Sequence, residues 1–147
     1  MLSLTFTVIV SLQEKQKEKQ LKYERKMLRE LSLKTLRLNI RDAFQMQELH
    51  RQYEDYCIEL GIESYLLGAR YSKFGYHGES FFDVKYRALE EEQQLTETLF
   101  QFLTSMTIRE IKLQDEELLF ESCQQFIGLW WQEGYEKGER RYRLKLH

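Results

Sequence analysis

The stretch YLLGARYSKFGYHGES, residues 65–80, decides how this chain folds. Its first half has helical spacing, and Gly68 offers a bare surface on which another helix can approach closely. Gly75 and Gly78 then break the helical pattern, and Ser80 is typical of the residue that caps a helix N-terminus. The stretch therefore predicts a helix in close contact with a neighbour, a glycine turn, and a second helix.

The sequence on either side of this turn also favours helices. It contains no proline, a residue that breaks helix interiors, and it is rich in strong helix formers. Long helices joined by short turns favour antiparallel neighbours. We therefore predict an all-α, single-domain bundle of about five helices over residues 13–147. The expected helices span 13–37, 40–60, 62–73, 81–105, and a last one that begins after a capping box at Thr107–Glu110, or near 115, and ends near 142.

Individual residues set the expected helix boundaries and contacts. Ser32 marks a break within the first basic helix, Asn39 is a candidate N-cap for the second, and Gly61 is placed to end the second in a left-handed conformation. Gly134 and Gly138 lie four residues apart on one face of the last helix. In a chain this charged they predict close packing or a weakened helix end, not a membrane helix pair.

Apolar residues at helical spacing give the expected inner faces. Cys57 and Cys123 lie on two of these faces, so we expect reduced core thiols; a disulfide between them is the alternative. In the first helix Leu21, Leu28 and Leu31 share a face with Met27 beside them, and in the second Leu49, Tyr53 and Leu60 share a face with Tyr56 alongside. The other expected inner-face residues are Ile62, Tyr65, Leu66 and Ala69 in the third helix, Phe82, Tyr86, Leu89, Leu99, Phe100 and Leu103 in the fourth, and Leu119, Phe126, Ile127 and Trp130 in the last.

The first twelve residues, MLSLTFTVIVSL, are apolar and uncharged. A transmembrane helix needs about 20 apolar residues, and the segment lacks the basic start of a secretory signal. We expect residues 1–12 to be a tail that forms a short strand or frays, or that results from a start site assigned too far upstream. No stable membrane insertion is expected.

Charge is distributed unevenly along the chain. Residues 13–41 carry ten Lys and Arg against four acids, residues 42–136 carry seven against nineteen, and residues 137–147 carry five against one. Two basic ends thus flank an acidic middle. The ends either lie on the acidic body or in solvent, or they contact nucleic acid, anionic lipid or an acidic partner.

Motifs for catalysis and for metal binding are missing from the sequence. There is no G-x-S-x-G elbow, no Glu-x-x-His pair and no glycine-rich phosphate loop of the two common types. The sequence therefore predicts no catalytic residue, no metal ligand and no cofactor.

The turn after residue 68 is the best candidate for a binding site. GYHGES leads into a helix N-terminus, whose free N–H groups can hold an anion, and Arg70, Lys73, Tyr76 and His77 lie beside it. The alternative is a turn that only caps the next helix. Trp131 is a second candidate, because its neighbour Trp130 takes the core position and leaves Trp131 to cover a helix edge or to contact a protein.

Three segments carry a resemblance to a known family. CIELGIESYLLGARYSKFGYHGES, EEEQQL and FIGLWWQEGYEKGERRYRLKLH resemble the YbaK-like small proteins of Bacillus and its relatives, which are distinct from the tRNA-editing deacylase of the same name. The resemblance covers the chain from the charged first helix onward, and residues 1–12 depart from it. It implies a cytoplasmic bacterial protein with a domain of unknown function, and it supplies no catalytic residues.

The leading expectation for function is a protein-binding or regulatory module without catalytic activity, whose partner is another protein or a second copy of the chain. The alternative is a small phosphate-bearing ligand, or enzyme chemistry, at the 68–80 turn. A further alternative is nucleic-acid contact through residues 15–29 and 140–145.

Overall fold

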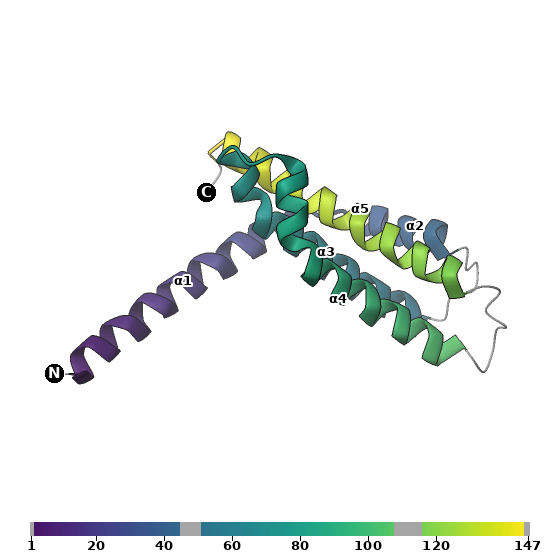
Figure 1. The fold of residues 1–147 in the computed structure, drawn as a ribbon, viewed down its shortest axis with the longest axis horizontal. Helices are drawn as coiled ribbons and strands as arrows, with labels where there is room; N and C mark the ends of the chain where they lie inside the picture. The colour runs from purple at the N-terminus through teal and green to yellow at the C-terminus, as the bar shows by residue number, and fades with distance from the viewer. Residues whose placement is uncertain (1, 45–50, 108–115, 146–147) are drawn as a thin grey trace.

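The computed structural model describes residues 2–44, 51–107 and 116–145, with side chains for 7–44, 53–105 and 116–145. Over these residues the chain forms helices and no strand, which confirms the all-α prediction. Figure 1 shows α2 to α5 side by side in a bundle, from which the N-terminal half of α1 projects. The helices are α1 (Leu2–Glu30), α2 (Leu33–Phe44), α3 (Arg51–Tyr76), α4 (Phe81–Thr107) and α5 (Glu116–Arg143).

The apolar N-terminal segment is helical, so the expectation of a strand or a frayed tail was wrong. No glycine or proline interrupts residues 2–30, and adding residues to an existing helix is far easier than nucleating one. Exposed Val8, Ile9 and Leu12 lie on the projecting half. Further along α1 it is Met27 that is fully buried, whereas Leu21 is about half exposed.

Ser32 separates α1 from α2, as predicted. The backbone N–H of Thr35 donates to Ser32 Oγ at 3.2 Å, so Ser32 caps α2. Asn39 lies inside α2 and caps nothing, which corrects the expected start of the second helix. The expected capping box at Thr107–Glu110 and the alternative start at 115 involve residues outside the described ranges.

Residues 51–60 of the expected second helix and the whole expected third helix form one helix, α3, whereas residues 40–44 belong to α2. Gly61 does not end a helix; it lies within α3, where Leu36 of α2 and Phe126 of α5 pack against its bare Cα. The missing side chain makes room for these neighbours, and burial outweighs the low helix propensity of glycine. Gly75 lies within α3, where Tyr135 packs against it, so the prediction that it breaks the helix was wrong. Gly78 forms the turn as expected, since it has a φ of 105° and Glu79 N–H donates to Phe74 O at 3.1 Å.

Ser80 then caps α4, as predicted. Its Oγ accepts a hydrogen bond from the N–H of Asp83 at 3.2 Å. The chain therefore reverses between α3 and α4 within residues 77–80, through a glycine in the left-handed region followed directly by an N-cap.

α3 and α5 form the centre of the bundle and cross with their backbones in contact. A Cβ built on Gly68 would overlap the carbonyl oxygen of Trp131, and a Cβ built on Gly134 would overlap that of Tyr65. The same close approach continues at Gly138, where a Cβ would meet Ser72. The close packing predicted for these glycines is thus confirmed.

The core has two parts around this crossing. The larger cluster joins all five helices and contains Cys57 and Cys123 as free, buried thiols, as predicted. The smaller cluster lies between α4 and the second halves of α3 and α5, and its largest member is Trp131. Its other buried members are Leu67, Val84, Ala88 and Tyr135.

Polar contacts hold the second half of α1 on this bundle. Tyr65 on α3 donates from its hydroxyl to Met27 O at 2.7 Å, and Tyr23 donates to Ala69 O at 2.9 Å. At the end of α1, Glu30 accepts from Arg141 at 2.6 Å. α1 therefore docks through hydrogen bonds to its neighbours more than through a continuous apolar face.

Candidate functional site

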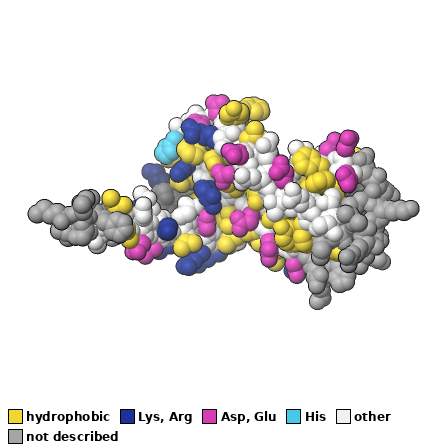
Figure 2. Space-filling view, turned by 60° about the horizontal axis from the view of Figure 1, so that its bottom comes forward, with side chains coloured by type: hydrophobic (Ala, Val, Ile, Leu, Met, Phe, Trp, Pro, Cys, Tyr) yellow, Lys and Arg dark blue, Asp and Glu magenta, His cyan; other side chains and the backbone are white. Residues whose placement is uncertain are grey.

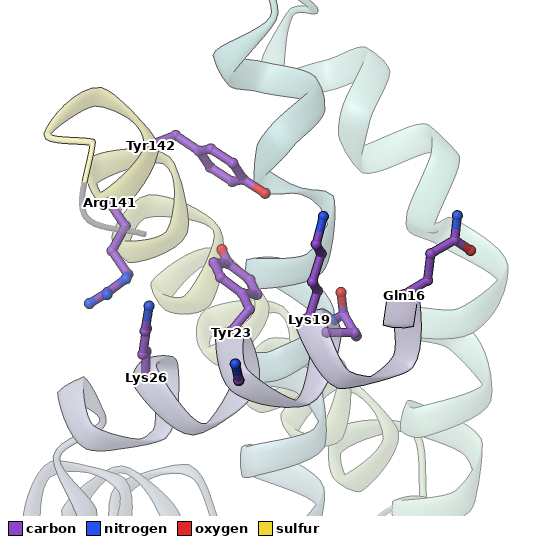
Figure 3. Close-up of a pocket in the computed structure, with 8 residues that line it drawn as sticks. Gln16, Lys19, Tyr23, Lys26, Arg141 and Tyr142 are labelled. Atoms are coloured by element: carbon purple, nitrogen blue, oxygen red, sulfur yellow. The ribbon is translucent and has the colours of Figure 1, made fainter. Parts of the chain in front are cut away.

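A groove lies where the second half of α1 meets the end of α5. It has a volume of about 540 Å³. Figure 3 shows Lys26 and Arg141 pointing toward one another from these two helices, with Tyr23 and Lys19 further along α1 and Tyr142 above them. The full set of lining residues is Gln16, Lys19, Gln20, Lys22, Tyr23, Lys26, Arg141 and Tyr142.

The lining of this groove carries four cations and no carboxylate. Lys19, Lys22 and Lys26 make no ion pair with any described residue. Arg141 is paired with Glu30, yet its buried Nε has no hydrogen-bond partner within the described part of the chain. The three unpaired lysines therefore give the groove an excess of positive charge.

Tyr23 and Tyr142 form the aromatic wall of the groove, and as neutral phenols they do not reduce its positive charge. The Tyr142 ring is 5.9 Å from that of Tyr23, and on another side it stacks on Tyr76 at 5.5 Å. Burial raises the pKa of Tyr23 to about 12 and also raises the pKa of Tyr142. Both phenols therefore stay protonated and neutral at physiological pH.

The two basic ends of the sequence thus come together in space. In Figure 2 the Lys and Arg side chains concentrate on the side of the bundle from which α1 projects, whereas Asp and Glu are spread more widely. Arg141 reaches Glu30 across 111 residues of sequence, and Lys137 Nζ donates to Glu30 O at 2.8 Å.

A second surface lies on α4 and was misassigned from the sequence. Phe82 and Tyr86, expected in the core, are 81% and 79% exposed, and Leu89 is 43% exposed. Val84 and Ala88 face the bundle in their place. Because α4 has apolar residues on two faces, the smaller ones lie against Trp131 and the aromatic ones remain in solvent. We call Phe82, Tyr86 and Leu89 the α4 stripe.

Acidic residues flank the α4 stripe on one side. Asp83, Glu90 and Glu97 repeat every seven residues, are exposed, and form no ion pair with the described residues. On the other side Lys85 is neutralised, since its Nζ lies 2.6 Å from Glu92 and 4.5 Å from the centre of the Trp131 ring. The stripe also borders a shallow groove of about 330 Å³ that reaches Gln124 of α5.

Comparison with known proteins assigns the chain to a family. The family model described as "Protein of unknown function (DUF2521)" matches residues 6–147. The chain belongs to this family. The DUF2521 match confirms the resemblance noted in the sequence, and it includes residues 6–12, which we had expected to depart from the family.

A curated relative is consistent with this membership. The "Uncharacterized protein YbaK" of Bacillus subtilis (strain 168) is 29% identical over 143 residues, which cover 94% of this DUF2521 chain and 97% of the relative. No solved structure matches the chain. In the described part of the chain, no helix is both long and apolar enough to cross a bilayer.

Two of the four residues proposed at the 68–80 turn contact other helices instead. Arg70 pairs with Glu24 of α1 at 3.2 Å, and Tyr76 stacks on Tyr142 of α5. Lys73 lies over the Phe74 ring at 5.3 Å, and His77 is exposed beside Tyr76. Arg70 and Tyr76 therefore support the groove between α1 and α5 instead of lining a site at the turn.

Trp131 is not at the surface, so its expected place at a helix edge or a protein contact was wrong. It is fully buried and stacks on Tyr135 with ring centres 5.2 Å apart. Sequence spacing could not show that α5 is covered on two sides, by the larger cluster around Trp130 and the smaller one around Trp131.

The buried thiols offer no reactive group. Burial, followed by the charge of Glu54, raises the pKa of Cys57 to about 12. Burial, followed by the neighbouring Cys57, raises the pKa of Cys123 to about 12. Since the thiolate is the nucleophilic form, both residues are core packing groups at neutral pH.

The sequence contained a signal for the α4 stripe that we did not use. Phe82, Tyr86, Leu89 and Gln93 follow the alternating spacing of four and three residues found in coiled-coil seams. The acids at 83, 90 and 97 occupy the adjacent flanking position of each heptad. A seam with a charged flank indicates a face for another helix, whereas the apolar spacing alone indicates only a buried face.

Proposed function

We propose that this protein is a binding module that docks an amphipathic helix of another protein on the α4 stripe. The observation that carries the proposal is the exposure of Phe82 and Tyr86, at 81% and 79%, one turn apart on the same face of α4. Large aromatic side chains are favoured anchors at protein interfaces. Neighbouring exposed aromatic residues on a well-formed helix are a typical docking surface for a second helix.

Charge complementarity indicates the chemistry of the partner. The row formed by Asp83, Glu90 and Glu97 makes no ion pair within the described ranges, and the opposite flank is neutralised by the pair of Lys85 and Glu92. A partner helix with apolar seam residues and Lys or Arg on one flank would meet both the stripe and the acids. Antiparallel pairing of two α4 helices would instead bring two acidic rows together, which disfavours self-association through this face.

Site-specific photocrosslinking tests the proposal. Tyr86 is replaced by p-benzoylphenylalanine in the native host, and crosslinked peptides are mapped by mass spectrometry. We expect one partner, joined through a segment with apolar residues at helical spacing and a basic flank. The matched control carries the same probe at Leu38, which is 49% exposed on α2, a helix that packs on α3 and α5 among the described elements.

The outcomes separate the proposal from its rivals. A crosslink to a second copy of this chain would mean self-association and overturn the heterologous partner. Absence of any crosslink from position 86, or the same set of products from positions 86 and 38, would overturn docking on the α4 stripe.

A further inference from the structure

We propose that the groove between α1 and the end of α5 binds a ligand through two or more phosphoryl groups. This site is separate from the α4 stripe and does not depend on the function proposed for it. It also differs from the 68–80 turn at which the sequence placed a phosphate ligand, because the cations that converge are those of the two basic ends.

The charge balance of the groove is the first support. Two carboxylates on the same half of α1 already have partners, since Glu24 pairs with Arg70 and Glu30 pairs with Arg141. Lys19, Lys22 and Lys26 remain unpaired among the described residues. Like charges gathered in one concave site repel one another, and an anion bound there removes that cost. Phosphoryl oxygens accept hydrogen bonds from both ammonium and guanidinium groups.

The spacing of the cations is the second support. Lys26 and Arg141 point toward one another at one end of the groove (Figure 3). Lys19 lies seven residues before Lys26 on the same helix, about 10 Å along its axis. A chain of phosphates or several backbone phosphates spans such a row with each lysine side chain extended, whereas one phosphate would require both lysines to bend toward it. The number of phosphoryl groups in the proposal follows from this length.

The rigidity of the groove is the third support. The hydroxyl of Tyr23 is fixed to Ala69 O and lies 3.2 Å from Ser72 Oγ, so this wall is anchored to α3. The guanidinium of Arg141 is held in place by Glu30, with Arg141 Nη1 and Glu30 Oε1 2.6 Å apart. A volume of about 540 Å³ lies within the range of small-ligand sites. The groove is therefore formed before any ligand enters.

Calorimetric titration of the full chain with sodium tripolyphosphate, ATP and the oligonucleotide (dT)20, each in 50 mM salt, tests the proposal. We expect tripolyphosphate to bind with a stoichiometry of one, and Lys19→Gln with Lys26→Gln to weaken it at least tenfold. The control, Lys17→Gln with Lys34→Gln, removes the same charge from exposed lysines outside the groove lining and is expected to change the affinity less than threefold. Melting temperatures of both double variants should match that of the parent chain.

The three ligands identify the source of the phosphates. Tighter binding of ATP than of (dT)20 indicates a nucleotide-like small molecule, and tighter binding of (dT)20, with steep salt dependence, indicates nucleic acid. Two results would overturn the proposal. One is the absence of binding by all three ligands; the other is an equal loss of affinity in the groove variant and the control, which would mean only general attraction to a basic surface.

Discussion

The contact between α3 and α5 and the contact between α1 and α3 are built in opposite ways. At the first, Gly68 and Gly134 let two backbones touch. At the second, Tyr65 and Tyr23 reach across with hydroxyl groups to backbone carbonyls. The first contact leaves no space and tolerates no added atom, whereas the second leaves room for a groove. A rigid pair of helices thus supports a separately attached basic helix.

The largest effect should come from filling the α3–α5 contact. Gly134→Leu places a side chain where the carbonyl of Tyr65 lies, so we expect a loss of at least about 4 kcal/mol in the free energy of unfolding, or failure to fold. Gly128→Ala is the matched control in the same helix, because its Cβ would approach no atom closer than 3.5 Å. It should stabilise by about 0.5–1 kcal/mol. Urea unfolding measures both, and similar effects would contradict the close crossing.

The second-largest effect should come from high pH, which weakens the contact between α3 and α5. The raised pKa of Cys57 and of Cys123, about 12 in each case against 9.0 in the unfolded chain, means that the folded state keeps protons that the unfolded state releases. Stability from this source is present below pH 9 and falls as the pH rises above it, by about 1 kcal/mol per thiol at pH 10. Urea midpoints at pH 8, 9 and 10 measure the loss.

A cysteine-free variant is the control for this pH effect. Cys57→Ala with Cys123→Ala should show a smaller decrease between pH 8 and pH 10, although its stability at pH 8 is lower. An unchanged urea midpoint for the parent chain from pH 8 to pH 10 would contradict the burial of these thiols.

The smallest effect concerns the α1 contact. Tyr65→Phe removes the donor to Met27 O and should cost about 1–2 kcal/mol. Tyr23→Phe should cost less, since Tyr23 is only partly buried. Tyr86→Phe, at a side chain that is 79% exposed, should cost nothing measurable. If Tyr65→Phe proves as mild as Tyr86→Phe in thermal unfolding, α1 is not held by this hydroxyl.

Sequence reasoning succeeded where a residue's role depends on its own backbone. Ser80 was identified as a helix cap, Ser32 as a break between helices and Gly78 as part of the turn, because these roles follow from side-chain acceptors and from backbone freedom. Gly68 and Gly134 were linked to close packing for the same local reason.

Sequence reasoning failed where the burial of a helix face depends on which neighbouring element covers it. Spacing alone could not choose between the two apolar faces of α4, and the choice is made by the bulk of Trp131 on α5. Gly61 looked like a helix end because the residues that fill its space, Leu36 and Phe126, are distant in sequence. The sequence named the two basic segments, 15–29 and 140–145, as a candidate contact, but spacing along the chain could not show that they form a groove.

The central claim is that the α4 stripe docks a partner helix, and the most direct measurement is the affinity of the crosslinked partner segment as a synthetic peptide. Phe82→Ser with Tyr86→Ser should weaken binding at least 30-fold, or about 2 kcal/mol, as expected for two interface anchors. Leu33→Ser with Leu38→Ser, which alters exposed leucines on α2, should change it less than twofold. Equal affinities for the α4 variant and the parent chain would contradict the claim.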